Sequence, residues 1–296
     1  MTASIYRTDD GRREIRARYR RMRDDLDAEF DEEWVETRFG RTHVLATGPE
    51  DAPPLVVFHG GNVVNPVSLE WFLPLADDYR LYAPDTVGHP GLSAETRVSP
   101  AGDDYGKWVV DVLDGLDLDR VPMVGPSYGA GIVVRTAAYA PERIEAASLV
   151  VPSGIASGSV LRMVRAVVVP MLVYRAFPTR ERLLRALQPM FSEPADELDP
   201  ELVDLVGAVF RHVKIERVMP AEATAAELAD FRAPTQVVAA ENDVFFPAEK
   251  VIPRAREVFP NVADVGLLAD SGHFPAPATR VEMVERIAAF LGERAR

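Results

Sequence analysis

The sequence predicts an α/β protein, with a doubly wound, mostly parallel sheet and an inserted helical cap. The first observation is a rhythm of short, largely apolar segments that alternate with helix-length segments, which is typical of a parallel sheet covered on both faces. The second is one interval of about 80 residues between two of the apolar segments, far more than a single crossover needs. An insertion between two strands of one sheet explains both.

Composition limits the classes of function. A chain of 296 residues that is 47% hydrophobic can build a sizeable core, as one large domain with an insertion or as two smaller ones. The formal net charge of −13 argues against a nucleic-acid partner, because phosphate backbones are bound by basic surfaces. Without cysteine, the chain has no disulfide, no thiolate metal ligand and no cysteine nucleophile. We expect no metal and no cofactor.

The first element, within residues 1–30, is predicted to be an amphipathic helix that packs on the main body. Its apolar stripe over residues 11–30 consists of Ile15, Tyr19, Met22, Leu26 and Phe30. The arginines from Arg12 to Arg23 would suit either a phosphate-binding patch or a solvated helix face, and the acidic residues that follow at once favour the solvated face. Since residues 1–20 contain no apolar core of a secretory signal, we expect a cytoplasmic protein.

The strands follow in order. Residues 34–38 and 42–46 alternate around a glycine turn and predict a hairpin. Further strands are predicted at 55–58, 80–83, 121–124, 146–151, 235–240 and 262–268. Helices are predicted at 68–76, 105–116, 128–139, 248–258 and 280–291. The core therefore comprises residues 1–152 and 234–296.

The inserted cap is predicted to span residues 153–233, with a helical and apolar first half and an acidic second half. Its most membrane-like segment runs from Val160 to Tyr174. That segment is too short to cross a bilayer and contains Arg162, Arg165 and Pro170, so a lid or a buried helix is the better interpretation. We expect no membrane partner.

The pentapeptide Gly125-Pro126-Ser127-Tyr128-Gly129 lies between the apolar run 121–124 and the helical stretch 128–139. This G-x-S-x-G pattern between a strand and a helix is typical of a nucleophile elbow. The sharp turn holds the serine in a strained conformation and leaves no room for side chains at the two flanking glycine positions. Ser127 is therefore the predicted nucleophile.

A serine hydroxyl needs a general base, usually histidine, and a carboxylate that orients this base. In the chain order typical of this elbow, the histidine comes last, after the final strand, and only His273 of the five histidines does. No Asp or Glu occurs from Pro152 to Arg180, so the acid is sought after strand 235–240. Asp243 is favoured there, with Glu241 in reserve, although Asp243 is also suited to cap the next helix.

An oxyanion hole is predicted from two backbone N–H groups. The residue after the nucleophile, Tyr128, supplies one. The segment His59-Gly60-Gly61-Asn62 follows strand 55–58, and its glycines allow the backbone to approach a substrate. We favour Gly61 as the second donor, with Asn62 as a further contributor. His59 is interpreted as a residue that braces the loop, because its place in the chain fits no triad role.

Over residues 31–296 the chain resembles serine hydrolases of the α/β-hydrolase family, most of all bacterial carboxylesterase-type members with a helical cap. The resemblance rests on the elbow, on the segment 59–61, on Asp243 and on Ser271-Gly272-His273. Residues 84–93 are similar to the family's D-x-x-G-x-G-x-S turn with one extra residue, and residues 140–144 resemble the segment that commonly follows the elbow helix. Dehalogenases and epoxide hydrolases of this fold carry aspartate where this chain has Ser127.

The resemblance implies hydrolysis of carboxylic esters through an acyl-serine intermediate. Other acyl-serine chemistry remains open, namely the hydrolysis of lactones, thioesters or carbon–carbon bonds and perhydrolysis, as does a non-catalytic binding module. The expected substrate is a small ester with an apolar part, and the protein is expected to be a monomer or a homodimer. Candidate pocket residues are Asn62, Met163, Met171, Tyr174 and Phe177, and for some of the four in the cap a place in the cap's own core is the favoured interpretation.

Overall fold

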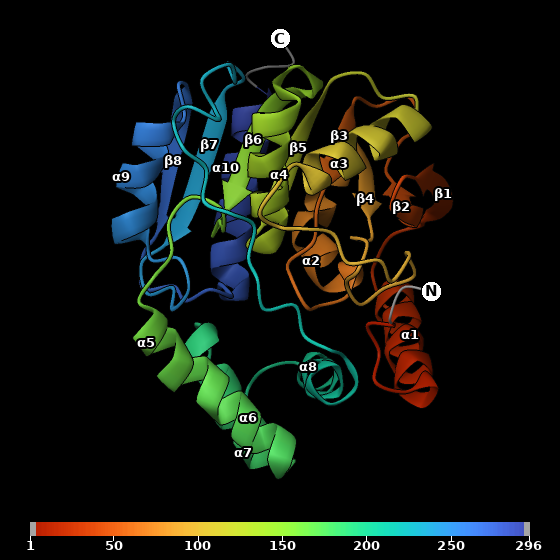
Figure 1. Cartoon of the computed structure of the whole chain (residues 1–296), viewed down its shortest axis with the longest axis vertical. Helices are drawn as coiled ribbons and strands as arrows, with labels where there is room; N and C mark the ends of the chain where they lie inside the picture. Colours follow the sequence, from red (N-terminus) through yellow and green to blue (C-terminus); the bar gives the residue numbers. More distant parts are fainter. Residues whose placement is uncertain (1–3, 293–296) are drawn as a thin grey trace.

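The computed structural model describes residues 4–292 of the chain and contains one eight-stranded sheet in the order β1-β2-β4-β3-β5-β6-β7-β8 (Figure 1). The hairpin of β1 (Asp31–Thr37) and β2 (Gly40–Thr47) is antiparallel, and β2 joins β4 (Arg80–Pro84) antiparallel as well. The other strand pairs are parallel. The predicted fold class is confirmed.

The parallel part of the sheet consists of β3 (Pro54–Val57), β4, β5 (Val121–Pro126), β6 (Ile144–Val150), β7 (Thr235–Ala240) and β8 (Val262–Leu268). The helices on it are α2 (Asn65–Phe72), α3 (Asp104–Gly115), α4 (Tyr128–Tyr139), α9 (Ala248–Val258) and α10 (Pro277–Gly292). One hydrophobic cluster packs α3, α4 and α9 on one face, and a second packs α2 and α10 on the other. Both faces of the sheet are therefore covered, which explains why its strands are so apolar.

Helix α1 (Asp9–Asp24) is shorter than the predicted stretch of 11–30. It begins where the Thr8 side chain accepts a hydrogen bond from the N–H of Gly11, and it ends before Asp25 and Asp27. Negative charges near a helix C-terminus oppose the helix dipole, which explains why the helix ends here and why the prediction for residues 25–30 was wrong. Ile15 and Tyr19 are fully buried, and α1 packs against α2 and α8 (Pro200–His212).

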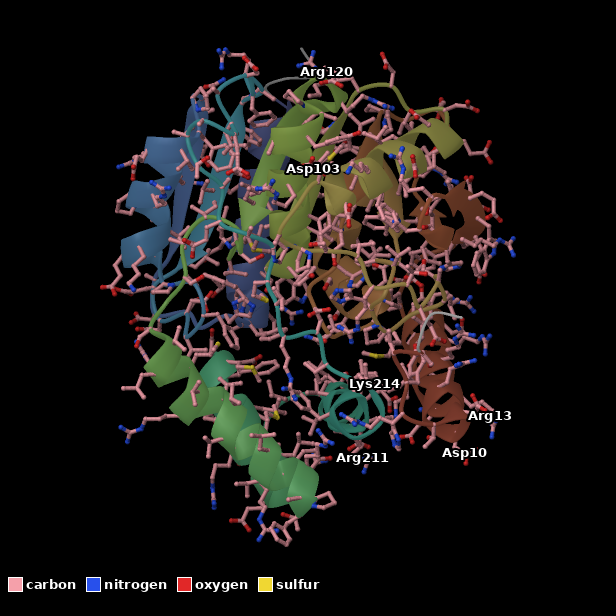
Figure 2. All side chains as sticks on the ribbon, viewed as in Figure 1. Asp10, Arg13, Asp103, Arg120, Arg211 and Lys214 are labelled. Atoms are coloured by element: carbon pink, nitrogen blue, oxygen red, sulfur yellow. The ribbon has the colours of Figure 1, made fainter. Side chains whose placement is uncertain are left out.

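Five of the seven arginines of α1 are paired with carboxylates. Ion pairs join Arg12 to Glu95, Arg13 to Asp10, Arg18 to Glu14 and Glu201, Arg21 to Glu201, and Arg23 to Asp24 and Glu32. The pair of Asp10 and Arg13 lies at the outer side of α1 (Figure 2). This arrangement supports the solvated face over a phosphate-binding patch.

The inserted segment carries α5 (Val160–Met163), a π-helical turn (Val164–Val168), α6 (Val169–Ala176), α7 (Arg180–Leu187) and α8. The first three form one continuous helix. Pro170 has no N–H for the carbonyl four residues earlier, which accounts for the π-helical turn beside it. In Figure 1 the green helices α5 to α7 extend away from the sheet. Within residues 4–292, no helix is both long enough and apolar enough to cross a membrane.

Candidate active site

Ser127 stands at the turn between β5 and α4 with φ 53° and ψ −114°, a conformation that L-residues rarely adopt. Its neighbours hold it there. The Ser127 N–H donates to the carbonyl of Val150 on β6 at 2.8 Å. The Ser127 carbonyl accepts from the N–H of Gly131 at 3.2 Å and from the Ser153 hydroxyl at 3.0 Å. The predicted elbow geometry is thus present, with the serine half-buried.

The two glycines of the pentapeptide are explained by close backbone contacts. A Cβ on Gly125 would lie 2.6 Å from the carbonyl carbon of Gly129, across the turn. A Cβ on Gly129 would lie 2.8 Å from the carbonyl oxygen of His59 and 2.9 Å from that of Phe58. Gly129 therefore lets the start of α4 approach the loop that follows β3.

His273 lies in the loop after β8, between Ser127 and Asp243. Its Nε2 is 3.0 Å from Ser127 Oγ, and its Nδ1 is 2.7 Å from Asp243 Oδ2. Asp243 is 1% exposed and His273 6% exposed, so both hydrogen bonds lie in a largely dry environment. The other oxygen of Asp243 accepts from the N–H of Phe245 at 2.7 Å and so stabilises the turn after β7. Helix α9 begins later, after Pro247, and has no side-chain cap, so the alternative that Asp243 caps the next helix is wrong.

Glu241, the reserve candidate for the acid, does not reach the imidazole. Its side chain accepts a hydrogen bond from the N–H of Asp270 at 2.9 Å. Asp270 has a positive φ of 55° at the beginning of the His273 loop. Glu241 therefore stabilises the shape of this loop from outside.

The inserted segment holds the other side of the His273 loop, a contact that the sequence does not predict. The Ser192 hydroxyl accepts from the N–H of Gly272 at 2.9 Å and lies 3.1 Å from the carbonyl oxygen of Phe274, to which it donates. The rings of Phe191 and Phe274 stack with their centroids 4.4 Å apart. Ser192 is 80 residues from Gly272 in the chain, and no sequence motif marks it.

Three consecutive N–H groups follow His59, and two of them are engaged. The N–H of Gly60 donates to Ser68 Oγ at 3.0 Å, and that of Asn62 donates to His89 Nδ1 at 3.3 Å. Among the described residues, no acceptor takes the N–H of Gly61. A Cβ on Gly61 would lie 3.0 Å from Tyr128 Cβ, so the two predicted donors are neighbours. Tyr128 is the first residue of α4, and its N–H has no partner within the helix.

The Asn62 side chain binds backbone rather than open space. Its Nδ2 donates to the carbonyl of Glu216 at 2.9 Å, and its Oδ1 accepts the N–H of Glu216 at 2.8 Å. Asn62 itself has a φ of 58°. Glu216 belongs to the chain that returns from α8 to β7, so Asn62 joins the loop after β3 to the inserted segment. This use of both polar atoms leaves the predicted contact with a substrate without support.

Two buried histidines brace the same loop. His59 Nδ1 donates to the carbonyl of Gly60 at 2.7 Å, while its Nε2 accepts from the N–H of Thr86 at 2.9 Å. Burial lowers the pKa of His59 and keeps the ring neutral. Burial also holds the pKa of His89 well below its usual value, with smaller contributions from His59 and Arg97. His59 thus has the bracing contacts that the sequence suggested.

The other predicted pocket residues have different environments. Met171 and Tyr174 are buried in the hydrophobic cluster of the inserted helices, which fits the alternative that they form the core of the cap. Phe177 is 64% exposed and lies under the guanidinium of Arg182. Met163 is half-buried on α5. A pocket role for these residues stays a prediction. The described residues contain no group of three or more His, Asp or Glu that could hold a metal ion.

Comparison with known proteins assigns the family. The family model of the alpha/beta hydrolase fold matches residues 53–276. Among curated proteins of Bacillus subtilis, this chain is 39% identical to the uncharacterized carboxylesterase nap and 36% identical to carboxylesterase YbfK, each over 123 residues. A solved structure of a putative Bacillus subtilis hydrolase superposes with a TM-score of 0.82 at 23% identity, covering 96% of this chain and all of that chain.

The alignments with the two curated carboxylesterases are partial. Each covers 40% of this chain and 40% of the relative's own length. The solved hydrolase extends the likeness over nearly the whole chain, but as a likeness of fold.

Proposed function

Because this chain belongs to the family of α/β-hydrolase fold proteins, we propose that it is a serine hydrolase that cleaves carboxylic esters. One observation carries the proposal: the hydrogen-bonded series of Ser127, His273 and Asp243, with contacts of 3.0 Å and 2.7 Å. Its relatives that are named carboxylesterases support ester bonds as the target.

In the proposed reaction, His273 Nε2 accepts the proton of Ser127 as Oγ attacks the ester carbonyl. Asp243 accepts the Nδ1–H and stabilises the imidazolium that forms, which its buried position makes effective. The N–H groups of Gly61 and Tyr128 bind the oxyanion. His273 then donates its proton to the leaving alcohol, which leaves an acyl group on Ser127. A water molecule deprotonated by His273 attacks this acyl group. His273 then returns the proton to Ser127 Oγ as the acyl–oxygen bond breaks, which releases the acid and regenerates the serine.

The inserted segment completes the proposal. We assign residues 153–233 as a cap over the site, because Ser192 and Glu216 contact the loops that carry His273 and Gly61. A small ester with an apolar part is the proposed substrate, and the aromatic rings of Phe245 and Phe274 beside His273 favour such a group. We further propose a cytoplasmic location and a monomer or homodimer, which cell fractionation and light scattering test.

The test of the function is hydrolysis of nitrophenyl esters of increasing acyl length, with a thioester and a lactone in the same panel. We expect Ser127→Ala and His273→Ala each to lower kcat/KM by at least about 10⁴-fold. Ser99→Ala, in an exposed loop, is the matched control and keeps full activity. Ester hydrolysis that persists in Ser127→Ala would refute the mechanism. A wild type active on the thioester or lactone alone would refute the assigned substrate class.

A further inference from the structure

The continuous helix from Val160 to Ala176 is apolar on two opposite sides. One side, with Val167, Met171 and Tyr174, is buried against α7 and α8. The other side is open. Of the twelve large hydrophobic residues that are exposed among those described, seven lie in residues 160–177, with exposed fractions from 37% to 68%. They are Val160, Leu161, Val168, Val169, Leu172, Val173 and Phe177, and we call this set the cap face. Such a concentration marks an interaction surface rather than scattered surface residues.

The residues around the cap face carry a net positive charge, whereas the whole chain is negatively charged. Residues 154–187 contain six arginines and one acidic residue, Glu181, which gives +5 in a chain of net charge −13. Arg180 and Arg185 have carboxylate partners, Asp204 and Glu181. Arg182 is half-buried and donates to the carbonyl of Phe177 at 3.1 Å. Among the described residues, no carboxylate lies within ion-pair distance of the three other arginines, which are exposed. These are Arg162, Arg165 and Arg175, all on the helix that carries the cap face.

Exposed apolar side chains interleaved with unpaired arginines fit the surface of an anionic lipid bilayer. Arginine stems extend along apolar surface while their charged ends reach the phosphates, and the apolar side chains enter the boundary of the acyl chains. Acidic residues elsewhere in the protein repel the anionic lipid only weakly, because charge repulsion beyond about 8 Å is screened at physiological ionic strength. A second copy docked face to face would instead bring two sets of unpaired arginines together, which is unfavourable.

The position of the cap face in the fold also suits a bound lipid bilayer. Helix α5 follows β6 through residues 151–159, at the carboxyl end of the parallel strands, where Ser127 follows the last residue of β5 (Figure 1). Side chains of α6 and α7 project outward on the side away from the sheet (Figure 2). A surface bound there would lie against the same end of the molecule as the candidate active site.

We propose that the cap face docks on the surface of an anionic phospholipid bilayer, with the helix lying in the plane of the surface. This revises the expectation that the protein has no membrane partner. Docking itself does not depend on catalysis. The consequence that esters dissolved in the bilayer reach Ser127 rests on the proposed function.

The experiment is co-sedimentation of the full chain with vesicles of mixed phosphatidylglycerol and phosphatidylcholine, and with vesicles of phosphatidylcholine alone. We expect at least about tenfold stronger partitioning onto the mixed vesicles. Leu161→Gln with Leu172→Gln lowers this binding at least about tenfold. Arg162→Gln with Arg165→Gln removes the preference for the anionic vesicles. Val281→Gln, an equally exposed position on α10, binds as the wild type does.

Two outcomes would overturn the proposal. One is equal or absent sedimentation of the wild type with both kinds of vesicle. The other is a dimer in light scattering that Leu161→Gln with Leu172→Gln dissociates, while vesicle binding stays unchanged. Hydrolysis of a soluble nitrophenyl ester monitors the same samples and is expected to be unchanged by all these substitutions. Ester hydrolysis without vesicle binding therefore rejects the docking surface alone, and vesicle binding without hydrolysis rejects the proposed function alone.

Discussion

Asp243 and Glu241 lie two residues apart in the loop after β7, and only Asp243 contacts the imidazole. Asp243→Asn is expected to lower kcat by about 10⁴-fold, because an amide disfavours the required tautomer of His273 and cannot stabilise its charge. Glu241→Gln, the matched control, is expected to keep kcat within about threefold, since its single hydrogen bond is exposed. Steady-state ester kinetics check both. A loss confined to Glu241→Gln would assign the acid to the wrong residue.

Asn62 is the residue whose role differs most from expectation. Asn62→Gly keeps the positive φ and removes both hydrogen bonds to Glu216, so the position of the Gly61 N–H loses its support. We expect kcat to fall about tenfold with little change in KM, because an oxyanion donor acts in the transition state. Asn261→Gly, which loses a hydrogen bond to the distant Arg232, serves as the control. An increase in KM alone would point to a direct contact with the substrate instead.

The residues differ in how well sequence could predict them. Ser127 was predictable because the constraint on the elbow is local, and Asp243 and His273 because chain order leaves few candidates. The bond from Asn62 to Glu216 spans 154 positions and ends on backbone atoms, which carry no residue preference. The contact of Ser192 could not be predicted for the same reason. Its hydroxyl binds backbone atoms of the His273 loop, and no feature of the sequence indicates which position of the cap meets Gly272.

At the scale of elements, the contact between α4 and the loop after β3 determines how closely the two predicted oxyanion donors approach. Gly129→Ala gains helix propensity of about 1 kcal/mol. However, its Cβ would meet two carbonyl oxygens at 2.8 Å and 2.9 Å, and overpacking of this kind typically costs about 1–3 kcal/mol. We expect a net lower free energy of unfolding together with reduced kcat. Urea denaturation and ester kinetics measure the two effects.

The control for this substitution is Gly102→Ala. Nothing lies within 4 Å of a Cβ at Gly102, so its stability is expected to match that of the wild type. If Gly129→Ala is as stable and active as Gly102→Ala, the close approach of α4 to the loop does not constrain the site.

Element boundaries were predicted less well than the elements themselves. Helices α2 and α10 begin three residues before their predicted starts, because proline suits the first turn of a helix but adds nothing to an amphipathic pattern. Helix α2 also ends earlier than predicted, at Phe72, and a 3-10 turn (Leu73–Asp77) follows it. The apolar stripe of α1 continued to Phe30, whereas the acidic residues after Asp24 ended the helix. In both cases, capping and charge outweighed hydrophobic periodicity.

At the scale of the whole molecule, His59 and His89 couple stability to pH. Their folded-state pKa values lie below the ordinary 6.5. Above about pH 6.5 both rings are neutral in the folded and unfolded chain, and they add no pH dependence. Below about pH 6.5, the unfolded chain binds protons that the folded chain does not. The free energy of unfolding therefore decreases as the pH is lowered. Each histidine contributes at most about 1.4 kcal/mol per pH unit.

Urea denaturation from about pH 7.5 down to about pH 5 measures this dependence, above the range where most carboxylates titrate. His89→Asn offers an acceptor for the N–H of Asn62 without the titrating ring, and we expect a flatter profile for it. An identical slope in His89→Asn and the wild type would show that His89 is not the source.

The insertion itself was predictable from chain length, because about 80 residues exceed what any crossover requires. Which parts of the insertion contact the active-site loops and which face solvent was not predictable from the sequence. Phe191 and Ser192 contact the His273 loop, while the cap face on residues 160–177 is open to solvent, and composition alone does not distinguish these segments.

The central claim is that Ser127 is the nucleophile, and the most direct measurement is labelling with a fluorophosphonate followed by mass spectrometry of the peptides. We expect one adduct per chain on the peptide that contains Ser127, formed at a rate that His273→Ala greatly reduces. An adduct on another residue, or equal labelling of Ser127→Ala, would contradict it.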